Sequence, residues 1–527
     1  MREIDMLILC VTIGDYDEGK LYDRLARVCP RLTSVSGKHI TGIGLRALGW
    51  MCGSTLTTLT FYDMTTNVND IILLLQRCPL LKVFNLDLTV PKPLDEDPSE
   101  NERVIQALVH SCPLLEELTL TSTSITDNCM LDLGALRKLI KLNIDQSTLL
   151  TRTGISRFLE SNTQLESLIF TDVRAFSRRV IDLHVDSIYT SIALNCKRLK
   201  VLDVYNMLGV DLSIGLVTIL SSCVNLEVIR IQDLFSYNYI NRDNLLLALM
   251  THCPNIVCIN LGGCYSDAVL IDLFRTYPQL TELKVHKLTD SAIDALNQYC
   301  PLLEMLSTHD VSEAALCQFF ECHPNLVEAP VINSKVALVS LARHCQRLMH
   351  LQIGFRTADY DISSFVEIER FHNLVSLSIA LGTPLNNEQA AILATRCWRI
   401  RRLTLHDFSA SGIVTMILHM PRLNVLTIHS SSQAVWDELV VLLKALDFKR
   451  SLYIHFSVTT TPQYTIELPS LTITSISASR AHAPAAPVVV PRRTPTEVYI
   501  SKYDIYYILS FAFTIIIASA VITTAVV

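Results

Sequence analysis

The sequence of 527 residues lacks the motifs by which many enzymes and metal proteins are recognised. It contains no GxGxxG or GxxxxGK[ST] nucleotide loop, no HExxH helix and no GxSxG nucleophile turn. No two of its 16 cysteines have CxxC spacing, which disfavours a zinc ribbon and a redox dithiol. We therefore expect a protein that is not an enzyme and that holds no cofactor and no metal ion.

Strong net charge and glycosylation sites are also missing. The formal net charge is only -7, which gives no reason to expect a nucleic-acid partner. None of the asparagines lies in an N-x-[ST] sequon, which favours a cytosolic protein. The apolar run 6–13 is short and is preceded by Glu3 and Asp5, so it does not resemble a signal peptide. We expect it to form the first strand of a repeat array.

What the sequence does contain is one apolar pattern that recurs along most of its length. Residues 112–120 read CPLLEELTL, a copy of the pattern C-P-x-L-x-x-L-x-L, and ten cysteines open such copies. There are 16 copies, with first apolar anchors from Leu32 to Leu423, and the period is about 26 residues. Cysteines that recur at one place in a repeat favour buried free thiols in a reducing compartment over a disulfide framework.

Each copy predicts one strand, because the last two apolar residues of L-x-x-L-x-L alternate and point to one face. Helical stretches such as 291–296 and 313–316 lie between the copies, and Asp290 and Ser312 are expected to cap them. The cysteine is expected to end the helix and pack inward. Such units stack into a curved α/β solenoid, with a parallel sheet on the concave side and the helices outside.

A repeat of this length with Cys-Pro before L-x-x-L-x-L resembles the cysteine-containing subfamily of leucine-rich repeats. That subfamily is found in F-box substrate receptors of cullin–RING ubiquitin ligases. The resemblance covers roughly residues 1–457. It implies a leucine-rich-repeat solenoid, and it adds a ubiquitin-ligase adaptor to the candidate partners. No F-box is visible, because the repeat strands are expected to begin by about Leu7.

Two C-terminal segments depart from the repeat pattern. Residues 458–504 are rich in Pro, Thr, Ser and Ala, which predicts a flexible linker, although 464–476 also suit a capping strand. Residues 505–527 carry no charge, and as a helix they would be roughly 34 Å long, enough to span a bilayer. Basic residues precede this segment and none follows it, so we expect a single-pass tail anchor with the repeats in the cytosol. The alternative is a buried helix of the solenoid.

Contacts with a protein partner are expected on the concave face, at strand positions that alternate with core positions. These residues are mixed in charge and include few aromatics, which suits a protein better than a nucleic acid. They are Glu117, Thr119, Lys141, Asn143, Asp203, Tyr205, Arg230, Asn260, Lys284, Gln352, Arg402 and Thr404.

Three histidines, His406, His429 and His455, follow the last apolar strand position in successive repeats. At a strand spacing of about 4.8 Å they would form a ladder on the concave face. Such a ladder could sense pH or bind a metal ion. Ordinary solvated side chains are the favoured interpretation, so no metal site is assigned.

The repeat, the missing catalytic motifs and the C-terminal segment together favour one function. We expect a noncatalytic scaffold for protein–protein interaction, anchored to a membrane through 505–527 with its repeat domain in the cytosol. The alternative, which follows from the resemblance, is a substrate receptor of a cullin–RING (SCF) ubiquitin ligase.

Overall fold

A computed structural model gives the structure of much of the repeat region. It describes residues 26–27, 31–38, 40–62, 66–87, 99–121, 125–145, 147, 149–171, 186–205, 213–232, 243–261, 265–309, 311–355, 367–381, 387–406, 409–430, 435, 438–439, 441–442, 452–458, 465–468 and 471–477.

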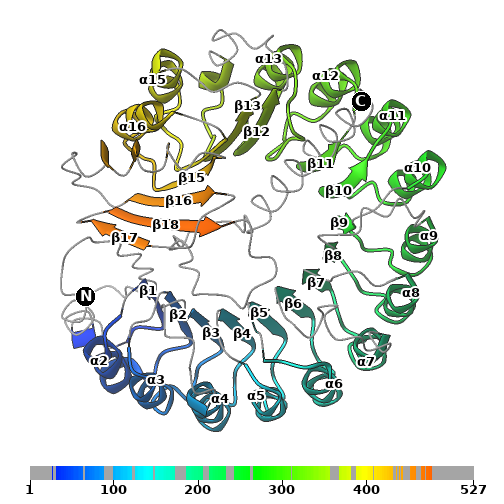
Figure 1. The fold of residues 1–527 in the computed structure, drawn as a ribbon. Helices are drawn as coiled ribbons and strands as arrows, with labels where there is room; N and C mark the ends of the chain where they lie inside the picture. Colours follow the sequence, from blue (N-terminus) through cyan, green and yellow to red (C-terminus); the bar gives the residue numbers. More distant parts are fainter. Residues whose placement is uncertain are drawn as a thin grey trace, which may run out of the picture.

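Strands and helices alternate along the chain, and the strands line the inside of a curved array while the helices form its outer layer (Figure 1). The strands are β1 (Ser34–Lys38), β2 (Thr58–Tyr62), β3 (Val83–Asp87), β4 (Glu117–Thr121), β5 (Lys141–Asp145), β6 (Ser167–Thr171), β7 (Val201–Tyr205), β8 (Val228–Gln232), β9 (Cys258–Leu261), β10 (Glu282–Lys287), β11 (Met305–His309), β12 (His350–Phe355), β13 (Ser376–Leu381), β14 (Arg402–His406), β15 (Val425–Ser430), β16 (Leu452–Val458), β17 (Thr465–Leu468) and β18 (Leu471–Ser477).

One helix lies between most successive strands, and both α12 and α13 lie between β11 and β12. The helices are α2 (Gly42–Cys52), α3 (Val68–Leu75), α4 (Ser99–Ser111), α5 (Asp127–Leu133), α6 (Arg152–Ser161), α7 (Asp186–Asn195), α8 (Ser213–Ser222), α9 (Asp243–His252), α10 (Asp267–Thr276), α11 (Asp290–Tyr299), α12 (Glu313–Cys322), α13 (Lys335–His344), the 3-10 helix η2 (Glu367–Arg370), α15 (Asn387–Arg396) and α16 (Ala410–His419).

The described strands form two sheets, in which spatial order follows chain order except that β17 and β18 are exchanged. The first runs from β1 to β11, and all its neighbouring strands are parallel. The second runs from β12 to β16 and continues with β18 and β17, of which only β17 is antiparallel to its neighbour. The predicted α/β solenoid, with a parallel sheet inside and helices outside, is confirmed.

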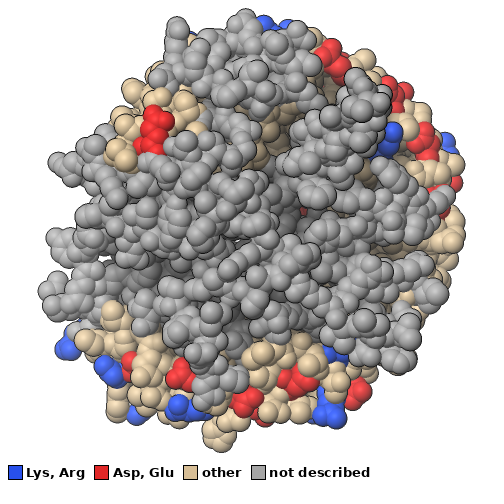
Figure 2. Space-filling view, in the orientation of Figure 1, with Lys and Arg blue, Asp and Glu red and all other residues tan. Residues whose placement is uncertain are grey.

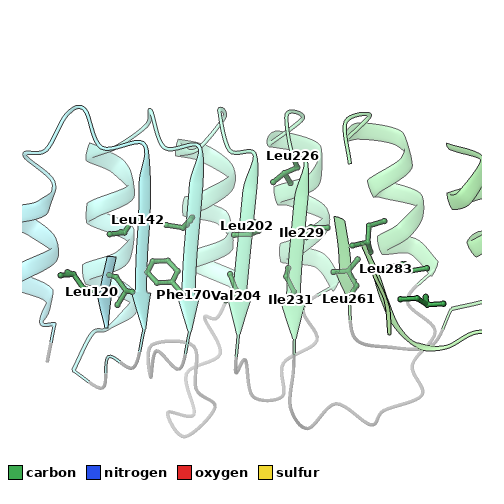
Figure 3. Packing of buried hydrophobic residues seen from close by; sticks show 14 of the residues in the cluster. Leu120, Leu142, Phe170, Leu202, Val204, Leu226, Ile229, Ile231, Leu261 and Leu283 are labelled. Atoms are coloured by element: carbon green, nitrogen blue, oxygen red, sulfur yellow. The ribbon is translucent and has the colours of Figure 1, made fainter. Parts of the chain in front are cut away.

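The pattern L-x-x-L-x-L supplies the core between the sheet and the helices, as predicted. Leu115, Leu118 and Leu120 are at most 1% exposed, whereas Glu117 and Thr119 between them are half-buried on the other face of β4. Figure 3 shows the equivalent leucines, isoleucines and valines of neighbouring repeats side by side between the strands and the helices. The core is therefore a continuous layer to which each repeat adds the same few side chains.

Where a described repeat carries its cysteine, that residue lies at the end of the helix and in the core, as predicted. Cys112 Sγ approaches the carbonyl oxygens of Cys78 and Leu75 of the preceding repeat at 3.4 and 3.7 Å, and Cys300 makes the same kind of contact. Burial raises the pKa of the Cys112 thiol to about 12, so it stays protonated and can act as a weak donor. Every described cysteine is a free thiol.

Two repeats fill the cysteine position with a larger donor. The Tyr277 hydroxyl donates to the carbonyl oxygens of Leu249 and Cys253 at 2.8 and 2.9 Å. A ring nitrogen of His323, Nε2, lies 3.1 Å from the carbonyl oxygen of Cys300. Both side chains are at most 1% exposed. In these two repeats, as in those with cysteine, a buried polar side chain contacts the repeat before it.

The copy that begins at Leu326 departs from the prediction of one strand per repeat. It forms only isolated bridges, which pair Glu328 with His350 and Ile332 with Ile353, and it separates the two sheets. Pro330 lies between the two bridges and has no N–H group to donate to a sheet. The sequence separation between paired residues also changes by one between the two bridges, which indicates a bulge.

The boundaries of the array differ from the prediction at the C-terminal end. β17 and β18 lie within the segment 458–504, at the stretch 464–476 that also suited a capping strand, and the sheet continues to Ser477. The expected strand at 6–13 and the expected membrane helix at 505–527 lie outside the described residues. Among the residues that the structure does describe, no helix is long and apolar enough to span a bilayer.

One of the two predicted helix caps is wrong by one residue. Ser312 caps α12, since its hydroxyl accepts from the backbone N–H of Ala315. Thr289, not Asp290, caps α11. The Asp290 carboxylate instead accepts from the backbone N–H of Ser312 at 3.2 Å, and therefore links its own repeat to the next.

Candidate partner-binding surface

The strand register places all twelve predicted contact residues on the face of the sheets opposite the core. In the first sheet Asn143, Asp203, Arg230, Asn260 and Lys284 occupy one row along β5, β7, β8, β9 and β10. The predicted residues of β4, β12 and β14 hold equivalent inner-face positions in their strands. The inner face is therefore continuous within each sheet, and its role in binding stays a prediction.

A charged pair occupies the inner face at β4 and β5. Lys141 Nζ lies 2.7 Å from Glu117 Oε1, and the two side chains are 54% and 40% exposed. Exposed pairs of this kind contribute little to stability, typically below about 1 kcal/mol. Both groups can therefore exchange this contact for a partner at low energetic cost.

A more enclosed charge cluster lies on β7 to β10. Arg230 donates through Nη2 and Nε to the Glu282 carboxylate at 2.6 and 3.2 Å, and Asp203 lies 3.7 Å from Nη1. Burial raises the pKa of the Asp203 carboxyl to about 6, despite the opposing effect of Arg230. Burial acts in the same direction on Glu282, but the Arg230 hydrogen bonds hold its pKa below the usual value. Arg230 and Glu282 thus form a built-in ion pair.

Sequence reasoning missed two members of this cluster. Glu282 opens β10, and it could have been found because it holds the same strand position as Glu117. Cys258 is not one of the ten repeat cysteines, and its register neighbours are Val228 and Glu282 on the inner face. Cys258 is 3% exposed, and burial raises the pKa of its thiol.

Not every predicted contact residue is accessible. Asn143 and Asn260 are only 9% and 7% exposed, so a partner could reach little of either side chain. Lys141 is exposed, while Thr119 and Thr404 are half-buried. The side chain of Tyr205 lies outside the described atoms, although its backbone pairs with Gln232.

The structure brings together two of the three histidines of the expected ladder. His406 pairs with His429, and their rings stack with centroids 4.5 Å apart and planes 19° apart. His455 does not continue the ladder, contrary to the expectation. It pairs with Thr427, while His429 pairs with Ser457. In the register, Ile454 pairs with Leu426 and Phe456 with Ile428, so His455 lies two residues earlier along its strand than the ladder requires.

The environment of the stacked rings disfavours a charged imidazole at His406. Burial, followed by the proximity of His429, lowers the pKa of His406 to about 3. No cluster of three or more His, Cys, Asp or Glu side chains suited to a metal ion occurs among the described residues.

In the part of the outer rim visible in Figure 2, Lys and Arg side chains are interspersed with Asp and Glu.

The fold and the inner surface define a class: the chain has a leucine-rich-repeat type of fold. No model of a known protein family matches the sequence, and no curated protein matches it. Among solved structures, the chain resembles Rad7 in a crystal structure of the yeast Rad7–Elc1 complex, with a TM-score of 0.38 and 16% identity over 79% of this chain and 85% of that one.

A second similar structure is that of a TLR13–ssRNA13 complex. Its TM-score is 0.29, with 14% identity over 82% of this chain and 65% of that one. Both TM-scores are below 0.5, so the assignment to a class depends on the repeats of this chain itself.

Proposed function

We propose that this protein is a noncatalytic scaffold whose inner sheet face binds a protein partner. The observation that carries the proposal is the strand register, which aligns polar side chains of mixed charge over consecutive repeats. A parallel solenoid surface of this kind offers one extended area without requiring a pocket. Individual contacts such as Lys141–Glu117 are weak enough to be replaced by those of a partner.

The test is affinity purification of the full chain in gentle detergent, followed by mass spectrometry. A partner that binds the inner face should be lost when Lys141→Glu reverses an exposed inner-face charge. The matched control is Lys138→Glu, which makes the same change at an exposed residue three positions earlier, outside the strand. Equal retention of the partner by both variants would contradict binding at this part of the face.

We also propose that residues 505–527 attach the protein to a membrane, with the repeats in the cytosol. The support is the uncharged sequence of that segment and the basic residues that precede it. Removal of 505–527 should move the protein from the membrane fraction to the soluble fraction. A truncated chain that stays with the membrane would argue against this segment as the anchor.

A ubiquitin-ligase substrate receptor is the second candidate. It is favoured by the ten cysteines that open the repeat pattern, because this form of the repeat resembles that of F-box receptors. The same purification tests it. Recovery of a cullin together with an F-box adaptor would favour the receptor, whereas a reproducible partner without ligase subunits would favour the plain scaffold.

A further inference from the structure

The two sheets differ in how the cations on their inner faces are neutralised. In the first sheet, Lys141 lies 2.7 Å from Glu117, and Arg230 lies 2.6 Å from Glu282. Each of these cations therefore has a carboxylate of the same face as its partner. A protein that binds the first sheet meets charges that are already matched.

Arg402, at the start of β14 in the second sheet, has no such match among the described residues. It is half-buried, and its register neighbours are Ser376 on β13 and Val425 on β15. A guanidinium that is partly removed from water and has no anion beside it is poorly compensated. It is the kind of group that gains most from an incoming carboxylate.

The nearest acidic positions in the row of Arg402 are distant. Glu328 lies three strands away on one side, and Glu467 lies four strands away on the other. At about 4.8 Å per strand, these separations are roughly 14 and 19 Å. Both exceed the screening length of about 8 Å at physiological ionic strength.

The remaining inner-face positions of β12 to β15 carry hydroxyl, amide or imidazole groups or small or apolar side chains, and none is acidic. They are His350, Gln352, Gly354, Ser376, Ser378, Ala380, Thr404, His406, Val425, Thr427 and His429. Serine and threonine hydroxyls and neutral imidazoles can all donate hydrogen bonds. The face therefore combines one uncompensated cation with many neutral donors.

His350 shows that the charge of Arg402 acts on this surface. His350 is 8% exposed, and its Nδ1 makes no hydrogen bond to a described residue. Burial, and next the charge of Arg402, lowers the pKa of its imidazole to about 4. The imidazole is therefore neutral near pH 7 and does not add a second positive charge.

From this contrast between the sheets, we infer that the inner face of β12 to β15 binds an acidic segment of the protein partner, with Arg402 pairing to a carboxylate. The inference rests on the proposed scaffold function and names the chemistry of the partner. The neighbouring hydroxyls of Ser376, Ser378 and Thr404 hold the same acidic segment through further hydrogen bonds.

The test uses the full chain in gentle detergent and a fluorescein-labelled peptide of alternating Glu and Ser, with a Gln–Ser peptide as the neutral comparison. Fluorescence anisotropy should show binding of the acidic peptide alone. Arg402→Gln should weaken it at least about tenfold, because the pair involves charged groups. Arg401→Gln removes the same charge from the exposed preceding residue and should change binding by less than about twofold.

Arg402→Lys serves as a second variant, because it keeps the charge and should retain most of the binding, with circular dichroism as the check on folding. Equal weakening by Arg401→Gln and Arg402→Gln would overturn the inference, since only net charge would then matter. Failure of the acidic peptide to bind, or equal binding of the neutral peptide, would overturn it too. The scaffold proposal would survive these results if Lys141→Glu still released a purified partner.

Discussion

At the scale of single residues, a substitution at the end of a helix can test how neighbouring repeats are joined. Tyr277→Phe keeps the ring and removes the hydroxyl that donates to Leu249 and Cys253. We expect a loss of about 1–2 kcal/mol in the free energy of unfolding, because a buried carbonyl loses its donor. Urea denaturation followed by circular dichroism measures it.

The control is Tyr299→Phe, because Tyr299 is only partly buried and lies over the guanidinium of Arg275. Its effect should remain below about 0.5 kcal/mol. If Tyr277→Phe were no more destabilising than this control, the hydroxyl would not contribute to the joint between repeats.

His350 makes stability depend on pH. Its native pKa of about 4 lies below the ordinary value of 6.5, so the unfolded chain takes up a proton first as the pH falls. The contribution of His350 to the free energy of unfolding is fully present above about pH 6.5 and is lost as the pH falls towards 4. The loss is of the order of 3 kcal/mol. His350→Gln should shrink the difference between the urea midpoints at pH 7.5 and pH 4.5.

Other groups titrate in the same range, so the comparison between variants is what counts. His406 acts in the same direction as His350. The pKa of Asp203 is raised to about 6, so its contribution to the free energy of unfolding is lost as the pH rises. His372→Gln changes an exposed histidine and is the control. A pH dependence that is the same in both variants as in the original chain would refute the role of His350.

At the scale of the helices, a cap offers a local test. Ser312→Ala removes the acceptor for the backbone N–H of Ala315 at the start of α12. The expected loss is about 1 kcal/mol, and Ser312→Asn should recover most of it because its side chain can accept the same bond. Urea midpoints for the three proteins test this prediction. Equal midpoints for the serine and alanine forms would refute it.

The strands and most of the inner face could be predicted from sequence, because one alternating pattern determines both the core and the opposite face. Glu282 was predictable by the same rule as Glu117. The stacked contact of His406 with His429 followed from spacing, but His455 did not, because Ile454 and Phe456 both suit the last core position. The ion pair of Arg230 with Glu282 bridges strands two apart, and its side-chain geometry is not contained in a pattern.

At the scale of the whole molecule, the interruption at Pro330 divides the inner layer into two sheets while α12 still packs against α13. We expect the backbone amides of 327–333 to exchange hydrogen at least about tenfold faster than those of 304–309 and 350–355. Fewer ladder bonds hold this segment in place. Hydrogen–deuterium exchange with mass spectrometry measures it, and uniform protection across the three segments would show that the interruption does not weaken the array.

The buried cysteines can report the unfolding of individual repeats. Cys78, Cys112, Cys196, Cys223, Cys300 and Cys345 are all fully buried free thiols, and burial raises the pKa of each to about 12. Alkylating reagents react with exposed thiolates, so each cysteine is protected until its own repeat opens. Brief labelling at increasing urea concentrations would therefore record, without any inserted probe, the order in which the individual repeats come apart.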